Sequence, residues 1–299
     1  MKNFRLLTAL ICVLSLALSA CSTEQVTATP TGAVITIEAP GVGIATVTFI
    51  DVGQGDATLI QTENHAMLID GGVRAAYQRV FATLWLEGIS HLDYIVATHP
   101  HADHIGGLVP LIGNDNGISV GTVIMPNVVH TTRTYEMFLE ALISAEVDVA
   151  EPYSGMELML DGAFFTIVAP NSSGHGNLNN YSIVMIMDHG DNSFLFAADA
   201  ERESELEILE NFGNISVDVL RVGHHGSRTS STPEFLDATS PRYAVISAGE
   251  GNQYGHPHDT VIERLNERGI NILITYEVGS IVMVSDGDEI EVTLCSLDL

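Results

Sequence analysis

From Ala45 onward, short apolar runs alternate with turns rich in Gly, Asp and Asn. Apolar runs of about 4–8 residues that end at such turns are typical of β-strands. This pattern predicts strands at 45–52, 57–63 and 65–71, a strand at 92–98 that leads directly into His99, and a strand at 122–127. Helical spacing of apolar residues predicts helices at 77–88 and 135–146.

The second half of the chain continues the alternation. We expect strands at 164–170, 182–190 and 192–199, the last two joined by a turn at 190–192, then strands at 217–223 and 243–249 and a closing pair at 271–279 and 280–287. Helices are expected at 201–213, 232–239 and 259–269. Because the strands come in runs between single helices, the pattern favours an α+β fold in which two sheets pack face to face with helices outside.

The first 20 residues have the pattern of a targeting segment. Lys2 and Arg5 precede an apolar run that is too short to remain in a membrane, and it ends at Leu18-Ser19-Ala20-Cys21. That ending resembles the bacterial lipobox, which implies a lipid on Cys21; an ordinary signal peptide and an uncleaved anchor are the alternatives. We expect a lipoprotein signal peptide at 1–20, a flexible tether at 21–44 and one domain at 45–299, held outside the cytoplasm at a membrane.

Composition limits the partners and the cross-links of this domain. The chain has 38 acidic and 11 basic residues and a net charge of -27, which disfavours binding to a polynucleotide but not a local basic or metal-lined pocket. Cys12 would leave with the signal peptide and Cys21 would carry the lipid, so Cys295 has no partner for an intramolecular disulfide. Stability must therefore come from the apolar core.

The most informative stretch is THPHADHIGG at 98–107. It places His99, His101, Asp103 and His104 where a buried strand ends, and in an extended segment the first two side chains point the same way. Imidazole and carboxylate groups are ligands of Zn, Fe and Mn. The stretch therefore predicts a metal site, and a chance cluster of polar loop residues is the alternative.

HPHADH matches the H-x-H-x-D-H motif of the metallo-β-lactamase superfamily. Six further segments occur in the order found in one branch of it: FIDVGQGDATLI, MLIDGG, NNYSIVMI, LFAADA, VLRVGHHGSRTS and GNQYGHPH. Together they resemble the metallo-β-lactamase domain of ComEC-type competence proteins and the related phosphorylcholine esterases. The resemblance covers residues 45–294 and implies a four-layer αββα sandwich with metals at one edge, between the sheets.

The resemblance also implies one or two Zn ions, with Mn or Fe as alternatives. It assigns the ligands as follows: His99 and His101 for the first metal, Asp103, His104 and His256 for the second, and Asp199 for both. Asp70 would orient ligands from behind, or else be a turn residue. The third histidine of the first site is missing, since Asn180 stands at its position, and His175 is a candidate substitute.

Other polar residues have less certain roles. One of His224 and His225 is expected to face the substrate, with His225 favoured as acid or phosphate binder, although the phase of the strand leaves the choice open. The loop with Asp51, Gln54 and Asp56 is either an edge of the site or a simple turn. Arg228 and Arg242 could meet a phosphate or a surface carboxylate, and we favour the carboxylate for Arg242.

Two such metals would produce a hydroxide that attacks a phosphodiester or another ester. Asp103 would orient it, and a histidine of the pair would protonate the leaving oxygen. We therefore expect an extracytoplasmic, metal-dependent phosphodiesterase. The alternatives are a ComEC-like nuclease acting on DNA, amide hydrolysis of the β-lactamase type, which the competence-type motifs disfavour, and a non-enzymatic metal-binding lipoprotein. The sequence leaves the substrate and the oligomeric state open.

Overall fold

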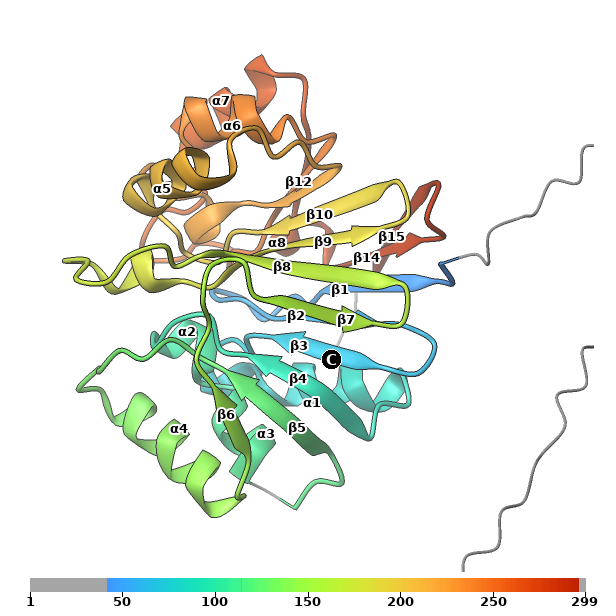
Figure 1. Ribbon diagram of the computed structural model, residues 1–299, viewed down its shortest axis with the longest axis vertical. Helices are drawn as coiled ribbons and strands as arrows, with labels where there is room; N and C mark the ends of the chain where they lie inside the picture. The colour runs from blue at the N-terminus through green and yellow to red at the C-terminus, as the bar shows by residue number, and fades with distance from the viewer. Residues whose placement is uncertain (1–41, 114, 296–299) are drawn as a thin grey trace, which may run out of the picture. The chain divides into compact units, whose positions relative to one another are not determined.

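In the computed structural model, two β-sheets pack face to face between two layers of helices (Figure 1). The structure describes residues 42–113 and 115–295, so the expected signal peptide and nearly all of the expected tether lie outside the described residues. This αββα arrangement confirms the expected fold. None of the helices in the described part of the chain combines the length and the apolar character that crossing a bilayer requires.

The first sheet has eight strands. Their order across the sheet is β15 (Ile290–Cys295), β14 (Ser280–Ser285), β1 (Ala45–Phe49), β2 (Thr58–Gln61), β3 (Ala66–Ile69), β4 (His91–Val96), β5 (Ser119–Ile124) and β6 (Asp148–Ala150). Neighbours from β3 to β6 are parallel, and the other pairs are antiparallel.

The second sheet has seven strands with the same division. Their order is β13 (Asn271–Ile274), β12 (Tyr243–Ile246), β11 (Val219–Arg221), β10 (Asn192–Phe196), β9 (Val184–His189), β8 (Ala163–Ala169) and β7 (Glu157–Leu160). Neighbours from β10 to β13 are parallel, and those from β7 to β10 are antiparallel. The expected turn at 190–192 joins β9 to β10, because His189 pairs with Asn192.

Helices cover the outer face of each sheet. The first sheet carries α1 (Tyr77–Leu86), α2 (Ala102–Ile105), α3 (Leu108–Gly113) and α4 (Arg133–Ser144). The second carries α5 (Arg202–Phe212), α6 (Pro233–Thr239) and α7 (Asp259–Glu267). A short helix, α8 (Thr275–Val278), lies between β13 and β14 in the chain.

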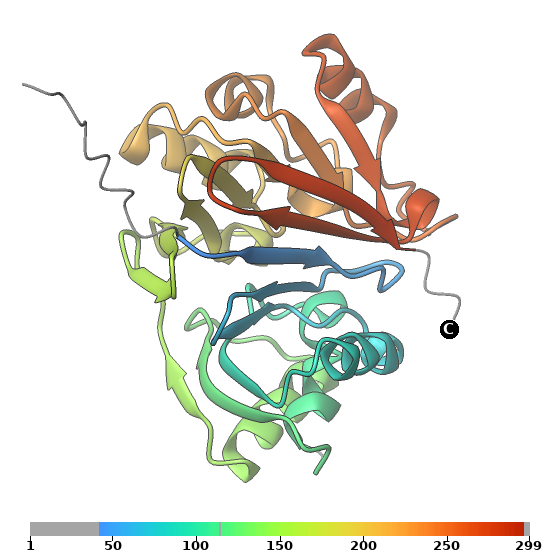
Figure 2. The same ribbon diagram turned by 90° about the vertical axis from the view of Figure 1, so that its right-hand side faces the viewer.

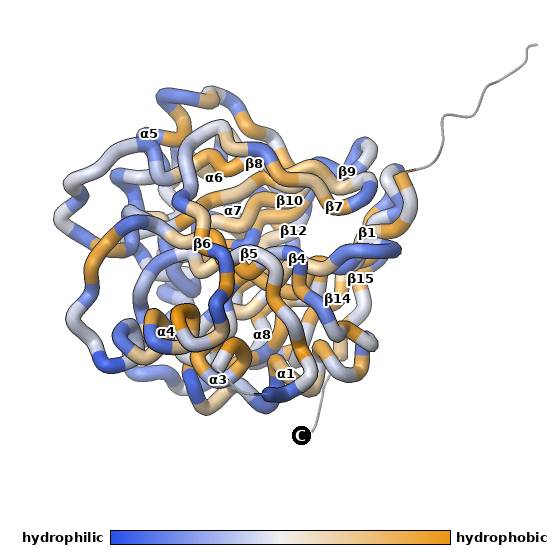
Figure 3. The backbone as a smooth tube through the Cα atoms, turned by 60° about the horizontal axis from the view of Figure 1, so that its bottom comes forward, coloured by the Kyte–Doolittle hydropathy of each residue, from blue (hydrophilic) through white to orange (hydrophobic). Residues whose placement is uncertain are grey.

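Both faces of the central strands are buried, which explains their continuous apolar runs. In β10, Phe194 and Phe196 point into the layer between the sheets, while Leu195 points outward to the layer under α5, α6 and α7. Figure 3 shows this concentration of hydrophobic residues on the inner strands. Each such side chain contributes roughly 1.5–3 kcal/mol when fully buried.

The last two predicted strands are present, but the prediction that they pair with each other was wrong. The run 271–279 forms β13 in the second sheet and then α8, whereas β14 crosses to the first sheet and lies between β1 and β15 (Figure 2). The apolar runs of β13 and β14 are equally suited to either sheet, so their composition could not separate them. Strand β15, the short strands β6 and β7, and helices α2 and α3 were not predicted at all.

Candidate metal centre

The polar residues singled out by the sequence lie at one edge of the sandwich. Asp70 follows β3 and His99 follows β4 in the first sheet, while Asp199 follows β10 and the pair His224–His225 follows β11 in the second. β3 is parallel to β4, and β10 is parallel to β11, so the carboxyl ends of each pair lie at a common edge. Such edges are where ligands bind in open α/β sheets.

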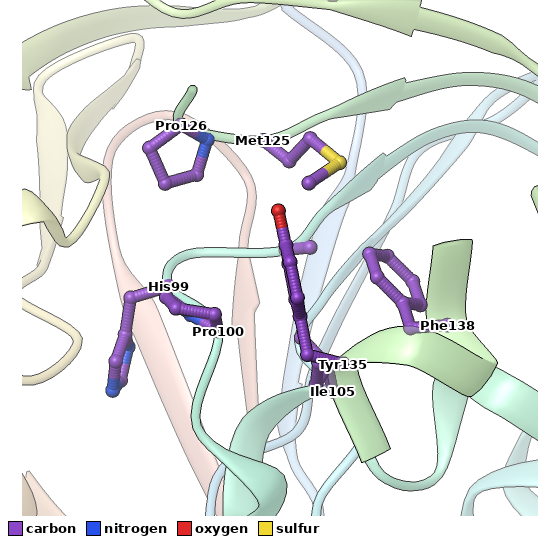
Figure 4. Close-up of a pocket in the computed structure, with 8 residues that line it drawn as sticks. His99, Pro100, Ile105, Met125, Pro126, Tyr135 and Phe138 are labelled. Atoms are coloured by element: carbon purple, nitrogen blue, oxygen red, sulfur yellow. The ribbon is translucent and has the colours of Figure 1, made fainter. Parts of the chain in front are cut away.

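His99 and His101 lie side by side where the chain leaves β4. The Nε2 atom of His99 is 2.9 Å from Nδ1 of His101, and its own Nδ1 is 3.3 Å from Oγ of Ser182. His99 is buried, and Ile105, Met125, Tyr135 and Phe138 line a small apolar space behind it, from which its imidazole points away (Figure 4). The contacts of its two ring nitrogens with Ser182 and His101 orient the ring.

His104 is held by a buried carboxylate. Its Nδ1 is 2.7 Å from Oδ2 of Asp70, and Asp70 also accepts hydrogen bonds from the backbone and hydroxyl of Thr98, at 2.9 and 2.7 Å. A proton on Nδ1 leaves the Nε2 lone pair free, and that atom is 3.3 Å from Oδ1 of Asp199. Such a carboxylate–histidine pair is a usual support for a metal ligand. Burial opposes charging of the ring, but Asp199 and Asp70 together raise the pKa of His104.

His225 presents its ring to the same point from the opposite sheet. Its Nδ1 is 2.9 Å from the carbonyl oxygen of Ser247, to which a proton on that atom is donated. Its Nε2 is 3.4 Å from Oδ2 of Asp103 and 3.5 Å from Oδ1 of Asp199. The side chain is fully buried.

These donor atoms fit a metal. One potential metal-ligand atom from each of Asp103, His104 and His225 lies within 4.8 Å of the other two, and the same holds for His99, His104 and Asp199. The Nε2 atoms of His104 and His225 and Oδ1 of Asp199 are buried and have no hydrogen-bond partner among the described residues. An unpaired buried polar atom costs about 1–3 kcal/mol, and lone pairs offered to a cation account for all three.

His256 lies in the same pocket, and its Nδ1 is likewise buried without a hydrogen-bond partner among the described residues, but His256 belongs to neither group of facing atoms. Its ring centre is 6.2 Å from that of His225 and 5.3 Å from that of His224. Burial and the neighbouring histidines His224 and His225 lower the pKa of His256 to about 4. The structure thus places His225, rather than His256, against Asp103 and Asp199.

His224 is the more accessible member of the pair, with a side chain 21% exposed. Its Nδ1 is 3.1 Å from Oε1 of Glu201, and its Nε2 is 3.6 Å from Oδ2 of Asp199. Burial opposes protonation, but the hydrogen bond to Glu201 and the charge of Asp199 raise the pKa of His224. The ring is therefore oriented by a carboxylate and reaches the cavity.

The backbone at this edge is strained. Asp70, Ala198, His224 and His225 have φ angles of 57°, 46°, 49° and 54°, in the left-handed region. Such residues cost of order 1–3 kcal/mol each and persist where the surrounding structure fixes them. The backbone N–H of His224 donates to the carbonyl oxygen of Ala198 at 2.8 Å, which links the two turns of the second sheet.

Donors from both sheets face a cavity of about 330 Å³. Its lining combines the candidate ligands with polar and aromatic groups: Gln54, His101, Ala102, Asp103, His130, Thr132, Asn179, Asp199, His224, His225, Tyr254 and His256. His130, which the sequence analysis did not select, has its ring centre 5.5 Å from that of His101.

Sequence reasoning also missed Arg221, which lies beneath the centre. Its buried guanidinium forms an ion pair with Asp56, donates to the carbonyl oxygen of Val222 at 2.9 Å, and has Nη2 at 3.3 Å from Nδ1 of His225. Burial lowers the pKa of Arg221 to about 9. A single arginine within the apolar run VLRVG was the available signal, because a buried charge needs a partner.

Several candidate residues lie away from the two groups of potential metal-ligand atoms. Asn180 and His175 both contact Glu203, at 3.0 and 3.4 Å, and it is Asn179 that lines the cavity. Asp51 forms a turn with the N–H of Gly53 and an ion pair with Arg79 at 3.1 Å, whereas Gln54 lines the cavity. The guanidinium of Arg242 lies 4.9 Å above the ring centre of Tyr243.

Comparison with known proteins gives a consistent result. The family model described as "Metallo-beta-lactamase superfamily" matches residues 50–250. ComE operon protein 3 of Bacillus subtilis (strain 168) is 32% identical over 253 residues, which cover 79% of this chain and 32% of that protein. Competence protein ComA of Neisseria gonorrhoeae is 33% identical over 233 residues, with 77% and 31% covered. The chain thus spans about a third of the length of these relatives.

Solved structures support the fold. The metallo-β-lactamase fold protein YhfI from Bacillus subtilis matches with a TM-score of 0.57 at 14% identity, covering 81% of this chain and 100% of that one. The CmlA β-hydroxylase E377D mutant matches with a TM-score of 0.53 at 17% identity, covering 80% and 53%. At these identities only the fold is shared. Because the family model spans more than half of the sequence and the sandwich is that of the family, the chain belongs to the metallo-β-lactamase superfamily.

Proposed function

We propose that this protein is a metal-dependent hydrolase of phosphodiesters. The observation that carries the proposal is the convergence of three buried atoms without hydrogen-bond partners: the Nε2 atoms of His104 and His225 both face Oδ1 of Asp199, and His225 and Asp199 line the cavity. Groups that bind, position and protonate a substrate surround them. The similarity to competence proteins favours phosphodiesters over β-lactams as substrates.

The geometry supports a revised ligand set. In this proposal His99, His101 and Asp199 hold one ion, and the second is held by Asp103, His104, His225 and Asp199. Divalent ions bound there would activate water and neutralise charge on the phosphate oxygens. We propose Zn, which imidazole and carboxylate groups bind, with Mn or Fe as alternatives. Iron is an alternative because CmlA from Streptomyces venezuelae, which shares the fold, is described as a diiron β-hydroxylase.

The chain's own residues supply the proton. With His225 assigned to the metal, His224 becomes the group that protonates the leaving oxygen, because it is partly exposed and Glu201 fixes its ring through Nδ1. Asp70 and the carbonyl oxygen of Ser247 hold His104 and His225 so that their Nε2 atoms face Asp199. The walls of the cavity, which include Gln54 and Tyr254, would position the ester.

Metal content and hydrolysis of bis-p-nitrophenyl phosphate test the proposal together. Purified protein should contain one to two transition-metal ions and hydrolyse this ester, and His225→Ala should lose metal and activity. His256→Ala, a change of a histidine in the same pocket, should keep the metal. If His256→Ala loses metal and His225→Ala retains it, the sequence-based assignment of His256 as ligand is the better one.

Two other functions lead to different results in the same assay. A nuclease, which the competence relatives favour and the acidic composition disfavours, would cleave single-stranded DNA much faster than bis-p-nitrophenyl phosphate. A non-enzymatic metal-binding protein would hold the metal and cleave neither. Hydrolysis of nitrocefin alone would indicate amide hydrolysis.

We also propose that the protein is a lipoprotein outside the cytoplasm, anchored through Cys21. The support is the sequence Leu18-Ser19-Ala20-Cys21 after an apolar run. Cys21→Ser should release the protein from the membrane fraction or leave its precursor unprocessed. Equal membrane association and equal mature mass of both forms would exclude lipidation at this cysteine.

A further inference from the structure

A second, larger groove of about 750 Å³ lies beside the candidate metal centre. Arg202 at the start of α5, Arg228 after the HHGS turn and Arg264 in α7 line it, and we call it the arginine groove. The mechanism proposed above uses none of these three residues. In a chain with 11 basic and 38 acidic residues, their convergence on one groove is the least expected feature of the charge distribution.

The positive charge of the groove remains largely available. Among the described residues, Arg228 has no carboxylate within ion-pair distance. Arg202 is 3.6 Å from Glu234, but both side chains are more than half exposed, so this pair is weak. Arg264 donates through Nη1 to the carbonyl oxygens of Ser230 and Ser231, at 3.2 and 3.1 Å, which fixes its position; its charge also interacts with the buried carboxyl group of Glu205.

The acidic residues of the groove are already engaged. Glu201 accepts hydrogen bonds from Asn177 at 2.9 Å and from Thr229 at 3.1 Å, in addition to its contact with His224. Glu203 accepts a hydrogen bond from Asn180 at 3.0 Å. These neutral donors orient the two carboxylates but leave their charges, so the three arginines of the groove outnumber its carboxylates by one.

The groove adjoins the metal cavity. Glu201 and Thr229 line the groove, and both contact His224, which lines the cavity; Oγ1 of Thr229 is 3.3 Å from Nδ1 of His224. Glu201, Thr229 and His224 therefore form the boundary between the two spaces. A substrate with two phosphate groups joined by a linker of a few atoms could place one in each.

We propose that the arginine groove binds a second phosphate group of the substrate while the first is held at the metal centre. The inference rests on the proposed function and narrows its substrate class to oligomeric phosphodiesters, as opposed to small esters with a single phosphate. Arginine suits this role because its planar guanidinium forms paired, charge-assisted hydrogen bonds with phosphate oxygens.

Two pairs of chromogenic substrates test the proposal. In the first pair the p-nitrophenyl ester of thymidine 5′-phosphate is compared with the same ester carrying a 3′-phosphate; the second pair reverses the positions. In one of the two pairs the additional phosphate should lower KM about tenfold or more, because it forms at least one additional charge-assisted hydrogen bond with the groove. Arg228→Ala and Arg202→Ala should each remove most of this gain, and Arg228→Lys should keep part of it.

Arg242→Ala is the matched control, because that arginine lies over Tyr243 and outside the groove. It should retain the full gain from the second phosphate. The proposal is overturned if the additional phosphate has no effect on KM in either pair, or if the groove variants weaken both members of a pair equally. Failure of the wild-type protein to hydrolyse even the esters with a single phosphate would instead refute the proposed function.

Discussion

At the scale of single residues, the contacts of Arg221 and Asp56 connect stability to the site. Both side chains are buried, they pair with each other, and Arg221 also touches His225. A buried ion pair contributes little by itself, but removal of one partner leaves an uncompensated charge in the core. The pair therefore constrains the turn that carries His225.

Arg221→Met should lower the free energy of unfolding by about 3–5 kcal/mol, because the buried Asp56 loses its arginine and keeps only a 3.9 Å contact with Nδ1 of His104. The double variant Arg221→Met/Asp56→Leu should recover most of that loss, since no charge remains. Urea unfolding of the two variants, followed by circular dichroism, provides the comparison. Equal stabilities of the single and double variants would show that the pair has no such role.

The site residues differ in how far the sequence could place them. The H-x-H-x-D-H spacing brings its own four side chains together because the segment is short. Assignment within His224–His225 required coordinates, since both residues have left-handed φ angles and strand alternation ends before them. Asn179 and Asn180 pose the same difficulty, because they lie in a short 3-10 turn (Leu178–Tyr181) and not in a strand.

At the scale of elements, the apolar runs predicted most strands and the long helices, because buried strands and amphipathic helices leave strong periodic signals. The sheet to which a strand belongs left no such signal, as β13 and β14 show. Helix α2 was missed because it is only four residues long, although it carries Asp103 and His104. Its position depends on the neighbouring turn after β3, which no local pattern reports.

Gly107 tests that contact between elements. A Cβ atom there would lie 1.9 Å from the carbonyl oxygen of Gly71, next to Asp70. Gly107→Ala should therefore displace the turn after β3, loosen the contact of Asp70 with His104, and weaken metal binding by roughly 10–100-fold. Competition with a chromophoric chelator measures this affinity.

Gly113→Ala serves as the control, because its added Cβ would meet only the methyl group of Ala141, at 3.5 Å. It should bind metal as the wild type does. Unchanged affinity in Gly107→Ala would mean that the turn after β3 can move without affecting His104, and that the support by Asp70 is dispensable.

At the scale of the whole molecule, the candidate metal centre lies between the two sheets. His99, His101, Asp103 and His104 come from the first sheet, while Asp199 and His225 come from the second. Facing carboxylates, among them Asp103 and Asp199, repel one another when no cation lies between them. A metal that binds only the folded chain therefore adds to its stability and ties the sheets together.

Removal of metal should consequently destabilise the entire fold. At a free metal concentration about 100 times Kd, binding adds about 2.7 kcal/mol, which corresponds to a rise in Tm of roughly 5–10 °C for a domain of this size. Scanning calorimetry with and without a chelator should show this difference, and Asp199→Asn should show a much smaller one. The gain should also diminish as the pH falls, because Asp199 and Asp70 raise the pKa of His104 against the effect of burial, so that a proton competes for Nε2. Equal Tm values with and without chelator at neutral pH would show that the facing donors do not hold a metal that links the sheets.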